Sequence, residues 1–436
     1  MSLIPFNNFS GQPAGLTTLF FTELWERFSY YGMRAILVLY LISDTSSKNP
    51  GLGWSNEDAI QLYGWYTALV YLACVPGGIL ADKYLSLKNS VILGGGLLCL
   101  GHLSLAVNHI HFFFFGLFSI ICGVGLLKPS ISSLVGNLYR KNDLRRDQGF
   151  TIFYIGINFG AFFASIIVGY VGEVYGWHFG FSLAGLGMVL GQIIFISGRK
   201  NFNNNLKTEK IVKKKNKLNK IEIDRIKLIA LASLILIIFW ASFEQAGGLM
   251  NIFAYEKTDR LIDFLNFEVP ASWFQSINPL LIILLGFFVS ALWLSFQKKG
   301  FLSSSIFKMA VGIIIMGAGF VFMFFAAQDA KIYGKSPMFW LMLAYLFHTI
   351  GELCASPVIL SFITKLSPKQ LVASIMGIYF AAIGLGNKFA GSIGQYSEKL
   401  GEKTVFIGIT IVCVSVGSIV IFFHNKLIRL SHGIDK

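Results

Sequence analysis

The stretch that decides the fold is Glu23-Leu24-Trp25-Glu26-Arg27-Phe28-Ser29-Tyr30-Tyr31-Gly32-Met33-Arg34. It lies inside an apolar run from about residue 16 to 42, which is long enough to cross a bilayer as a helix. A charge at the centre of such a helix costs roughly 2.5–3.5 kcal/mol, so it needs protein or water around it. The polar positions recur at the helical period and share one face. We expect that face to point into a helix bundle or an aqueous cavity.

Two carboxylates of this stretch crowd one cation, since Glu23 and Glu26 both lie within about one turn of Arg27. A static ion-pair ladder that only locks helices together is one interpretation. Such a ladder needs balanced pairs, whereas two acids around one Arg suit a site that takes up and releases protons.

This pattern also resembles a family signature. Glu23-x-x-Glu26-Arg27-Phe28-x-Tyr30-Tyr31-Gly32 is similar to the motif of the proton-dependent oligopeptide transporters, a branch of the major facilitator superfamily. The resemblance implies two six-helix halves with the substrate bound between them at mid-membrane.

Composition agrees with a membrane protein. The chain has 436 residues, of which 55% are hydrophobic and only 13% are charged, against about 25% charged in soluble domains. The net charge of +14 sits mainly in short links between apolar runs, which argues against nucleic-acid binding. The five Cys lie in apolar segments without CxxC spacing and the seven His do not cluster, so we expect no disulfide, metal or cofactor.

The apolar runs predict an all-α membrane protein with twelve transmembrane helices in two six-helix halves. The expected spans are 17–42, 57–80, 89–107, 111–137, 149–172, 178–197, 227–253, 271–296, 303–326, 337–363, 371–397 and 403–424. The links on one side hold 25 of the 36 Lys and Arg residues, which predicts that both termini are cytoplasmic.

The longest polar segment divides the chain. We predict an N-terminal bundle over 1–198, a basic cytoplasmic linker over 199–226, and a C-terminal bundle over 227–436 with a short cytoplasmic tail. Within the linker, 213–220 is either a solvated charge run or an amphipathic helix on anionic lipid. Bacterial members of the family usually carry two extra helices here, and this chain has room only for the linker.

Polar motifs recur in the first half. Gly77-Gly78-Ile79-Leu80-Ala81-Asp82-Lys83 resembles the superfamily's cytoplasmic loop motif, where Asp82 caps the next helix or pairs with a basic partner at a gate; an ordinary acidic turn is the alternative. Lys128 precedes Pro129 deep in an apolar span and would belong to the family's central site, with snorkelling to the interface as the alternative. Asn158, in a stretch like the family's second signature, is a substrate contact or a helix–helix hydrogen bond.

The second half carries its own polar groups. Glu244 is another membrane carboxylate, close to Trp240. Asn278 follows the family pattern for the binding cavity, although helix capping by Ser276 or Asn278 is the alternative. Glu352 is the only charge in its span before the cytoplasmic end, so it must be neutral or partnered.

The resemblance implies a proton-coupled symporter that imports di- and tripeptides by alternating access. Arg34 and Lys128 would bind the peptide carboxylate. Glu352 would bind the amino group, with Asn158 and Asn278 assisting. The other residues expected around the substrate are Tyr31, Tyr71, Trp240, Ser356 and Tyr379. The last stands where the family usually has Trp, a change that could alter which side chains are accepted.

Protons would act at two places. Protonation of Glu23 or Glu26 would release Arg27, and Glu244 would exchange between Arg34 and a proton at the outer gate. The partners expected are therefore a small peptide, protons and the lipid bilayer of a bacterial inner membrane, with the chain as a monomer.

Two alternatives stay open. The first is a proton-coupled carrier of another solute, such as nitrate, a siderophore, a drug or an amino-acid derivative. The second is a membrane-embedded enzyme or a channel. We expect neither an enzyme nor a channel, because no Ser-His-Asp, HExxH or phosphate-loop motif has a suitable context and no ring-forming repeat suggests a pore.

Overall fold

The computed structural model describes residues 11–139, 143, 145–202, 218–299, 302, 304–368 and 371–435. These residues form two compact units. Unit 1 takes its described residues from Met1–Trp54 and Leu69–Ile211, and unit 2 from Ser55–Ala68 and Val212–Lys436. The second helix therefore belongs to both units, its first part to unit 2 and its end to unit 1. Most of the predicted linker, including 213–217, lies outside the described residues.

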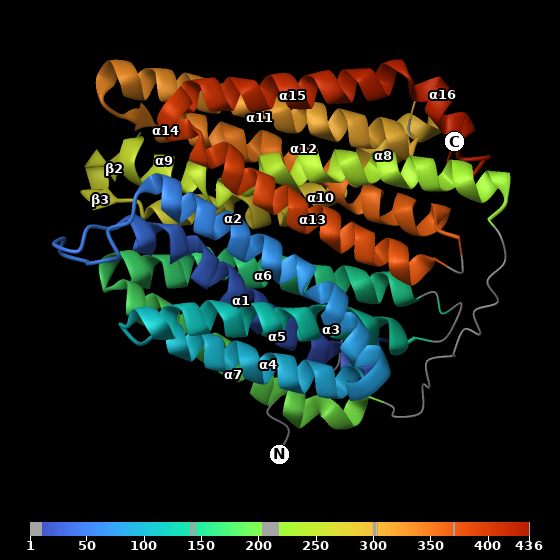
Figure 1. Cartoon of the computed structure of the whole chain (residues 1–436), viewed down its shortest axis with the longest axis horizontal. Coiled ribbons are helices and arrows are strands. Elements are labelled where there is room, and N and C mark those ends of the chain that lie inside the picture. The colour runs from blue at the N-terminus through green and yellow to red at the C-terminus, as the bar shows by residue number, and fades with distance from the viewer. Residues whose placement is uncertain are drawn as a thin grey trace. The chain divides into compact units, whose positions relative to one another are not determined.

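Unit 1 is a bundle around α1, most of which is buried. Helix α1 packs against α6 and α7, while α4 packs against α5 and α7 (Figure 1). The elements of unit 1 are α1 (Ala14–Ile42), the end of α2 (Asn56–Leu72), α3 (Cys74–Leu80), the π-helix η1 (Ala81–Leu85), α4 (Leu87–Leu105), α5 (Ile110–Asn137), α6 (Arg145–Val174), α7 (Trp177–Gly198) and η2 (Arg199–Asn201).

Unit 2 is a second helical bundle, in which α11 packs against α12 and α15, and α8 packs against α13 (Figure 1). Its helices, besides the first part of α2, are α8 (Lys220–Phe243), η3 (Glu244–Ala246), α9 (Leu249–Lys257), η4 (Asp263–Leu265), η5 (Ala271–Ser276), α10 (Ile277–Lys298), α11 (Ser305–Tyr333), α12 (Met338–Leu366), α13 (Val372–Gln395), α14 (Ser397–Leu400), α15 (Glu402–Phe422) and α16 (His424–Arg429).

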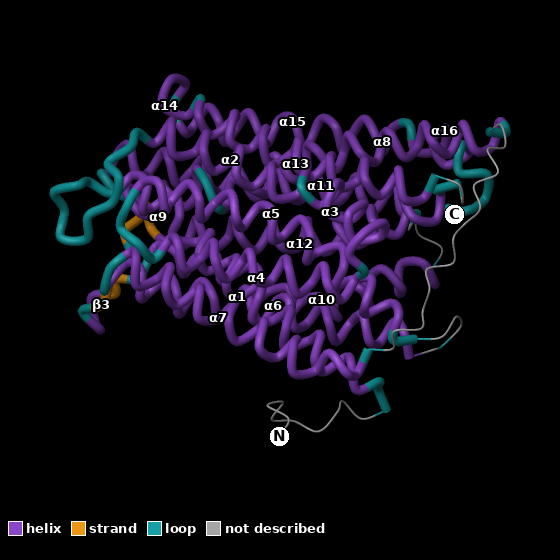
Figure 2. Tube along the Cα trace, turned by 60° about the horizontal axis from the view of Figure 1, so that its bottom comes forward, coloured by secondary structure: helices purple, strands orange, loops and turns teal. Residues whose placement is uncertain are grey.

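Unit 2 also holds four two-residue strands: three follow the end of α9, and the fourth lies between α11 and α12 (Figure 2). Strand β1 (Thr258–Asp259) pairs in parallel with β4 (Ser336–Pro337), and β2 (Leu261–Ile262) pairs antiparallel with β3 (Phe267–Glu268). These strands tie together the connections at one end of unit 2.

The all-α prediction is confirmed. Each of the twelve predicted spans coincides with a helix or a run of helices. Within the described residues, nine helical segments are long and apolar enough to cross a membrane. Helix α1 is not among the nine, in keeping with its four charged residues, and neither are α4 and α13. The total of twelve crossings thus stays a prediction.

Helix α8 begins at Lys220 with a capping box, which is earlier than the predicted end of the linker at residue 226. The Asn219 side chain accepts a hydrogen bond from the Glu222 backbone N–H at 2.8 Å, and the Glu222 carboxylate accepts one from the Asn219 N–H at 2.9 Å. Two amide groups that a helix start leaves unpaired are satisfied in this way.

Facing glycines bring helices together in both units. A Cβ on Gly101 of α4 would lie 2.8 Å from the Gly116 carbonyl oxygen of α5, and a Cβ on Gly116 would lie equally close to the Gly101 oxygen. In unit 2, Gly312 of α11 and Gly351 of α12 face each other in the same way. Without a hydrophobic driving force in lipid, such close backbone approach supplies packing energy.

Helix α3 offers a sharp test of this packing. A Cβ on Gly77 would lie 2.0 Å from the Gly125 carbonyl oxygen, whereas a Cβ on Gly78 would find its nearest atom, in Pro129, at 3.8 Å. We therefore expect Gly77→Ala to destabilise the protein by about 1–3 kcal/mol through overpacking. Gly78→Ala should be neutral or slightly stabilising because Ala favours helix. Thermal unfolding of both variants in detergent checks this, and equal stability would contradict the close approach.

Candidate functional site

The charged face of α1 forms a buried ion cluster in unit 1. The Nε of Arg27 lies 3.1 Å from Glu23 Oε1 and also contacts Glu26 Oε2. All three side chains are buried. Helical spacing explains the contact between Glu23 and Arg27, which are four residues apart and so project from the same face. The structure therefore brings both carboxylates into contact with the same Arg.

Hydrogen bonding within this cluster is incomplete. Among the described protein atoms, Glu23 Oε2, Glu26 Oε1 and Arg27 Nη2 are buried and lack a hydrogen-bond partner. Buried polar atoms normally have one, because leaving them unpaired costs free energy. Each carboxylate therefore has one oxygen that can be protonated, while its other oxygen contacts Arg27.

Two cations stack on tyrosines beside this cluster. The Arg34 guanidinium lies over the Tyr31 ring at 4.9 Å from its centroid, and the Lys128 Nζ lies 3.9 Å from the Tyr71 centroid. Both distances fall within the range of cation–π attraction. Lys128 also interacts electrostatically with Glu23. Four of the residues predicted to bind substrate are therefore held as two stacked pairs within unit 1.

Asn158 bonds within its own helix. Its Nδ2 donates to the Tyr154 carbonyl oxygen at 2.9 Å, one turn earlier in α6. The side chain is buried. This contact lies within α6, so it is not the hydrogen bond to another helix that was considered from the sequence.

In unit 2, α10 and α12 bring an amide to a carboxylate. Asn278 Nδ2 donates to Glu352 Oε2 at 2.7 Å, and Thr349 Oγ1 lies 3.1 Å from the same nitrogen. Helix α10 begins at Ile277 without a side-chain cap, and Ser276 Oγ instead donates to the Trp273 carbonyl oxygen. The capping alternative for Ser276 and Asn278 is therefore wrong, and Asn278 orients Glu352.

Glu244 stands where α8 ends and the short η3 begins. Its side chain is buried, and the Tyr63 hydroxyl donates to its Oε2 at 3.0 Å from the part of α2 that belongs to unit 2. A Cβ on Gly247 would lie 1.9 Å from that hydroxyl oxygen, so glycine makes the contact possible. A broken helix with a buried acid suits an ion or proton site.

The chain is also similar to a known protein family and to solved structures. The POT family (PTR2) matches residues 88–230 and 220–410, which is most of the chain. The chain belongs to the POT family.

Relatives of this POT family member cover its whole length. A di-/tripeptide transporter of Lactococcus lactis subsp. cremoris is 34% identical, over 97% of each chain. A solved structure of a peptide transporter POT variant in complex with alafosfalin has a TM-score of 0.88 at 31% identity and covers 98% of this chain and 97% of its own. A POT family transporter solved with 5-aminolevulinic acid has a TM-score of 0.86 at 29% identity, covering 97% and 99%.

These matches confirm the major facilitator fold and a multi-pass membrane protein. The alignment with the Lactococcus relative spans 484 positions, more than the 436 residues of this POT family member. The relative therefore carries segments that this chain lacks.

Three further residues predicted around the substrate lie in unit 2. Trp240 packs edge-on against Phe239 and Phe243 at 5.8 and 5.3 Å between ring centroids, and Tyr379 is buried in α13. Ser356 is half-buried one turn beyond the predicted amine-binding acid.

Asp82 needs a correction. It lies within the π-helix η1 and is exposed, whereas α4 begins after Ser86. It is therefore neither in a loop nor the cap of α4, because the helix continues through Ala81–Leu85.

Sequence reasoning missed two contributors, Tyr63 and Thr349. Neither side chain is charged, and neither belongs to the motifs described above. Tyr63 precedes Tyr71 by about two turns of α2, which was the available signal. The partner of Tyr63, Glu244, is 181 residues away and could be found only in the folded chain.

Proposed function

We propose that this POT family member is a proton-coupled symporter that imports di- and tripeptides. The observation that carries the proposal is that each unit holds groups of opposite charge to those of the other. Unit 1 presents the stacked cations Arg34 and Lys128, and unit 2 presents Glu352 oriented by Asn278. A zwitterionic peptide offers a carboxylate to the cations and an ammonium group to the acid. A relative named as a di-/tripeptide transporter supports the same substrate class.

Binding both ends of the substrate provides the coupling to conformational change. A peptide that engages Arg34 and Lys128 at one end and Glu352 at the other has a different affinity for states in which these groups are near or far. Only such differential affinity can shift a conformational equilibrium. Residues proposed to line the rest of the site are Tyr31, Tyr71, Asn158, Trp240, Asn278, Ser356 and Tyr379.

Proton uptake is proposed at the α1 cluster and at Glu244. A proton on Glu23 or Glu26 would weaken the hold of that acid on Arg27, whose remaining contact is with the other carboxylate. Glu244 would exchange between a proton and a cation such as Arg34, with the Tyr63 hydroxyl supporting the charged form. One inward proton supplies about 2.3 kcal/mol per 100 mV.

The proposed setting is a bacterial inner membrane with both termini in the cytoplasm. Alternate links rich in Lys and Arg support this orientation. We propose that the chain works as a monomer and that Asp82, in η1, acts at a cytoplasmic gate. Its exposed position leaves it accessible to a basic partner.

The proposal is tested by uptake of labelled dialanine into proteoliposomes. We expect accumulation only under an inward proton gradient or an inside-negative potential, and collapse of that accumulation by an uncoupler. Protein inserted in both orientations must be counted, so protease accessibility of the linker should be measured in the same vesicles. Absence of dialanine uptake by folded, inserted protein would contradict the peptide assignment.

A second substrate class is favoured by one observation. A POT family transporter of similar fold was solved with 5-aminolevulinic acid, an amino-acid derivative that also carries an amine and a carboxylate. The same opposite charges would bind it. Competition between labelled 5-aminolevulinic acid and unlabelled dialanine ranks the two, and we expect dialanine to compete at lower concentration.

A further inference from the structure

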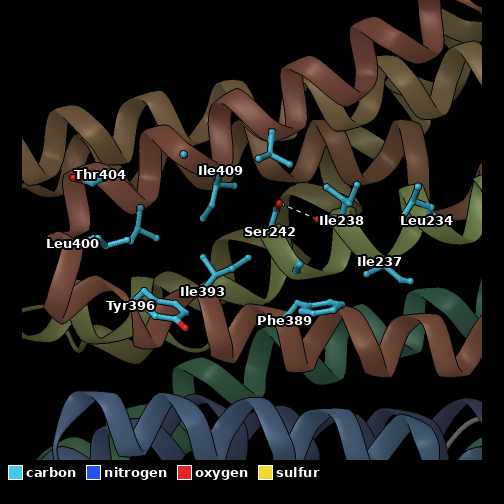
Figure 3. A pocket seen from close by; sticks show the side chains of 14 residues that line it. Leu234, Ile237, Ile238, Ser242, Phe389, Ile393, Tyr396, Leu400, Thr404 and Ile409 are labelled. Carbon is cyan, nitrogen blue, oxygen red and sulfur yellow. Dashed lines mark hydrogen bonds between the residues drawn. The ribbon is translucent and has the colours of Figure 1, made fainter.

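A groove of about 580 Å³ runs over unit 2 between α8, α13 and α15 (Figure 3). Leu234 and Ile237 lie at one end of it, and Tyr396, Leu400 and Thr404 lie at the other. None of its lining residues belongs to the ion clusters described above. Its volume falls within the range of about 300–1,000 Å³ typical of ligand sites.

None of the residues that line the groove is charged, so its interior does not suit a charged or zwitterionic ligand. Its deep wall is aliphatic and aromatic. The one hydroxyl there, Ser242 Oγ, already donates to the Ile238 carbonyl oxygen at 3.0 Å and lies 3.2 Å from Cys413 Sγ. Apolar cavities exclude water, and the side chains that line an empty one lack partners for dispersion contacts. The ligand that fits this lining is therefore a hydrocarbon.

The groove is short along the helices that line it. On α15 its lining runs from Thr404 to Val412, which is about 12 Å at 1.5 Å per residue. A membrane-spanning helix of about 20 residues is about 30 Å long, so the groove would hold only part of such a helix. A hydrocarbon chain can lie along its whole length.

The surroundings identify the hydrocarbon as lipid. Helices α8 and α15 are both apolar enough to span a membrane. The lining side chains Phe389, Leu400 and Val412 are about half uncovered by protein, so bilayer chains meet them directly. The end of the groove at Tyr396 and Thr404 lies beside the connection between α13 and α15. A polar headgroup can reach water there, because the helices end at this point.

We propose that this groove between α8, α13 and α15 is a binding site for one acyl chain of a bilayer phospholipid. The chain enters at the α13–α15 connection, with the headgroup beside Tyr396, and its tail runs along α8 toward Leu234. The proposal depends on the membrane-spanning helices and is independent of which solute the protein transports.

Gly408 gives a clean way to fill the site. It lines the groove on α15, and a Cβ added there meets no atom within 4 Å. Gly96 of α4 is also a half-buried helical glycine with open space at its Cβ, and it lies outside the groove. Gly408→Phe should therefore occlude the groove without a clash, Gly408→Leu should occlude it partly, and Gly96→Phe is the matched control.

The test uses the purified full chain in vesicles of phosphatidylethanolamine and phosphatidylglycerol, with a trace of phosphatidylglycerol that carries a diazirine in its acyl chain. After irradiation, mass spectrometry maps the labelled peptides. We expect labelling concentrated in α8, α13 and α15, reduced at least fivefold in Gly408→Phe and less in Gly408→Leu, and unchanged in Gly96→Phe. Excess unlabelled phosphatidylglycerol should lower the labelling, whereas glycerol phosphate should not.

Several results would overturn the site. Labelling spread evenly over lipid-facing helices would show no preferred groove. Undiminished labelling in Gly408→Phe and Gly408→Leu, both eluting as monodisperse protein, would place the lipid elsewhere. Competition by glycerol phosphate would make the headgroup the ligand. A dimer in the vesicles, with α8, α13 and α15 protected from the lipid label, would make the groove a protein interface.

Discussion

Replacing Glu26 with Gln is expected to abolish proton-driven accumulation of dialanine while leaving counterflow exchange intact. Glu26 is fully buried and contacts the Arg27 Nε. Gln keeps the shape of the side chain but cannot change charge, so the proposed proton-dependent release of Arg27 is lost. With one proton per peptide, an inside-negative potential of 100 mV should give about 50-fold accumulation in the wild type and none in the variant.

Two further variants belong to this experiment, one at the second acid of the cluster and one as a control. Glu23→Gln should show the same defect, because its carboxylate shares Arg27 at 3.1 Å. Glu268→Gln is the control, since it removes an exposed acid that pairs with Arg260 and should leave accumulation unchanged. Loss of counterflow in Glu26→Gln would show that the acid is needed for folding or binding. Normal accumulation would remove it from the coupling mechanism.

Replacing Glu352 with Gln is expected to abolish recognition of the peptide amino group. In the wild type, dialanine should bind roughly 10–100-fold more tightly than its analogue lacking the amine, because hydrogen bonds between charged groups contribute about 1.5–3 kcal/mol. In Glu352→Gln, dialanine should bind as weakly as that analogue. Asn278 already orients the carboxylate at 2.7 Å, so little reorganisation is needed on binding.

Lys128→Gln provides the matched experiment at the other end of the peptide. It should lose the preference for a free carboxylate over a C-terminal amide and keep the preference for a free amine. Inhibition of counterflow by the two analogues, measured in both variants, gives four comparisons. If each variant lost both preferences, the effect would be a general loss of the site. If neither preference changed, the proposed assignment of peptide ends would be contradicted.

The charged face of α1 shows how far sequence reasoning reaches. The contact between Glu23 and Arg27 joins residues four apart, and helix geometry places these two on one face before any tertiary structure is known. The apolar spans are equally local, since about 20 residues suffice to cross the bilayer. Charges inside such spans mark functional positions because they are costly there.

Hydrogen bonds between segments far apart in the sequence could not be predicted in this way. Asn278 was predicted at the cavity, but its bond to Glu352 joins α10 and α12, and the capping alternative could be excluded only by the structure. The bond between Tyr63 and Glu244 was not anticipated. The first part of α2, Ser55–Ala68, packs with unit 2, although its sequence position suggests the first half.

By itself the sequence determined that this protein is an all-α membrane protein of the POT family, with a buried acid–Arg cluster on its first helix. These features are local: span length, helical period and motif. Only the tertiary structure decided which helices supply the partners of Glu244 and Glu352, where α2 packs, and that α8, α13 and α15 leave a groove. The physical reason is that lipid-facing and protein-facing sides of a membrane helix are both apolar, so hydrophobic periodicity carries little information about which helices meet.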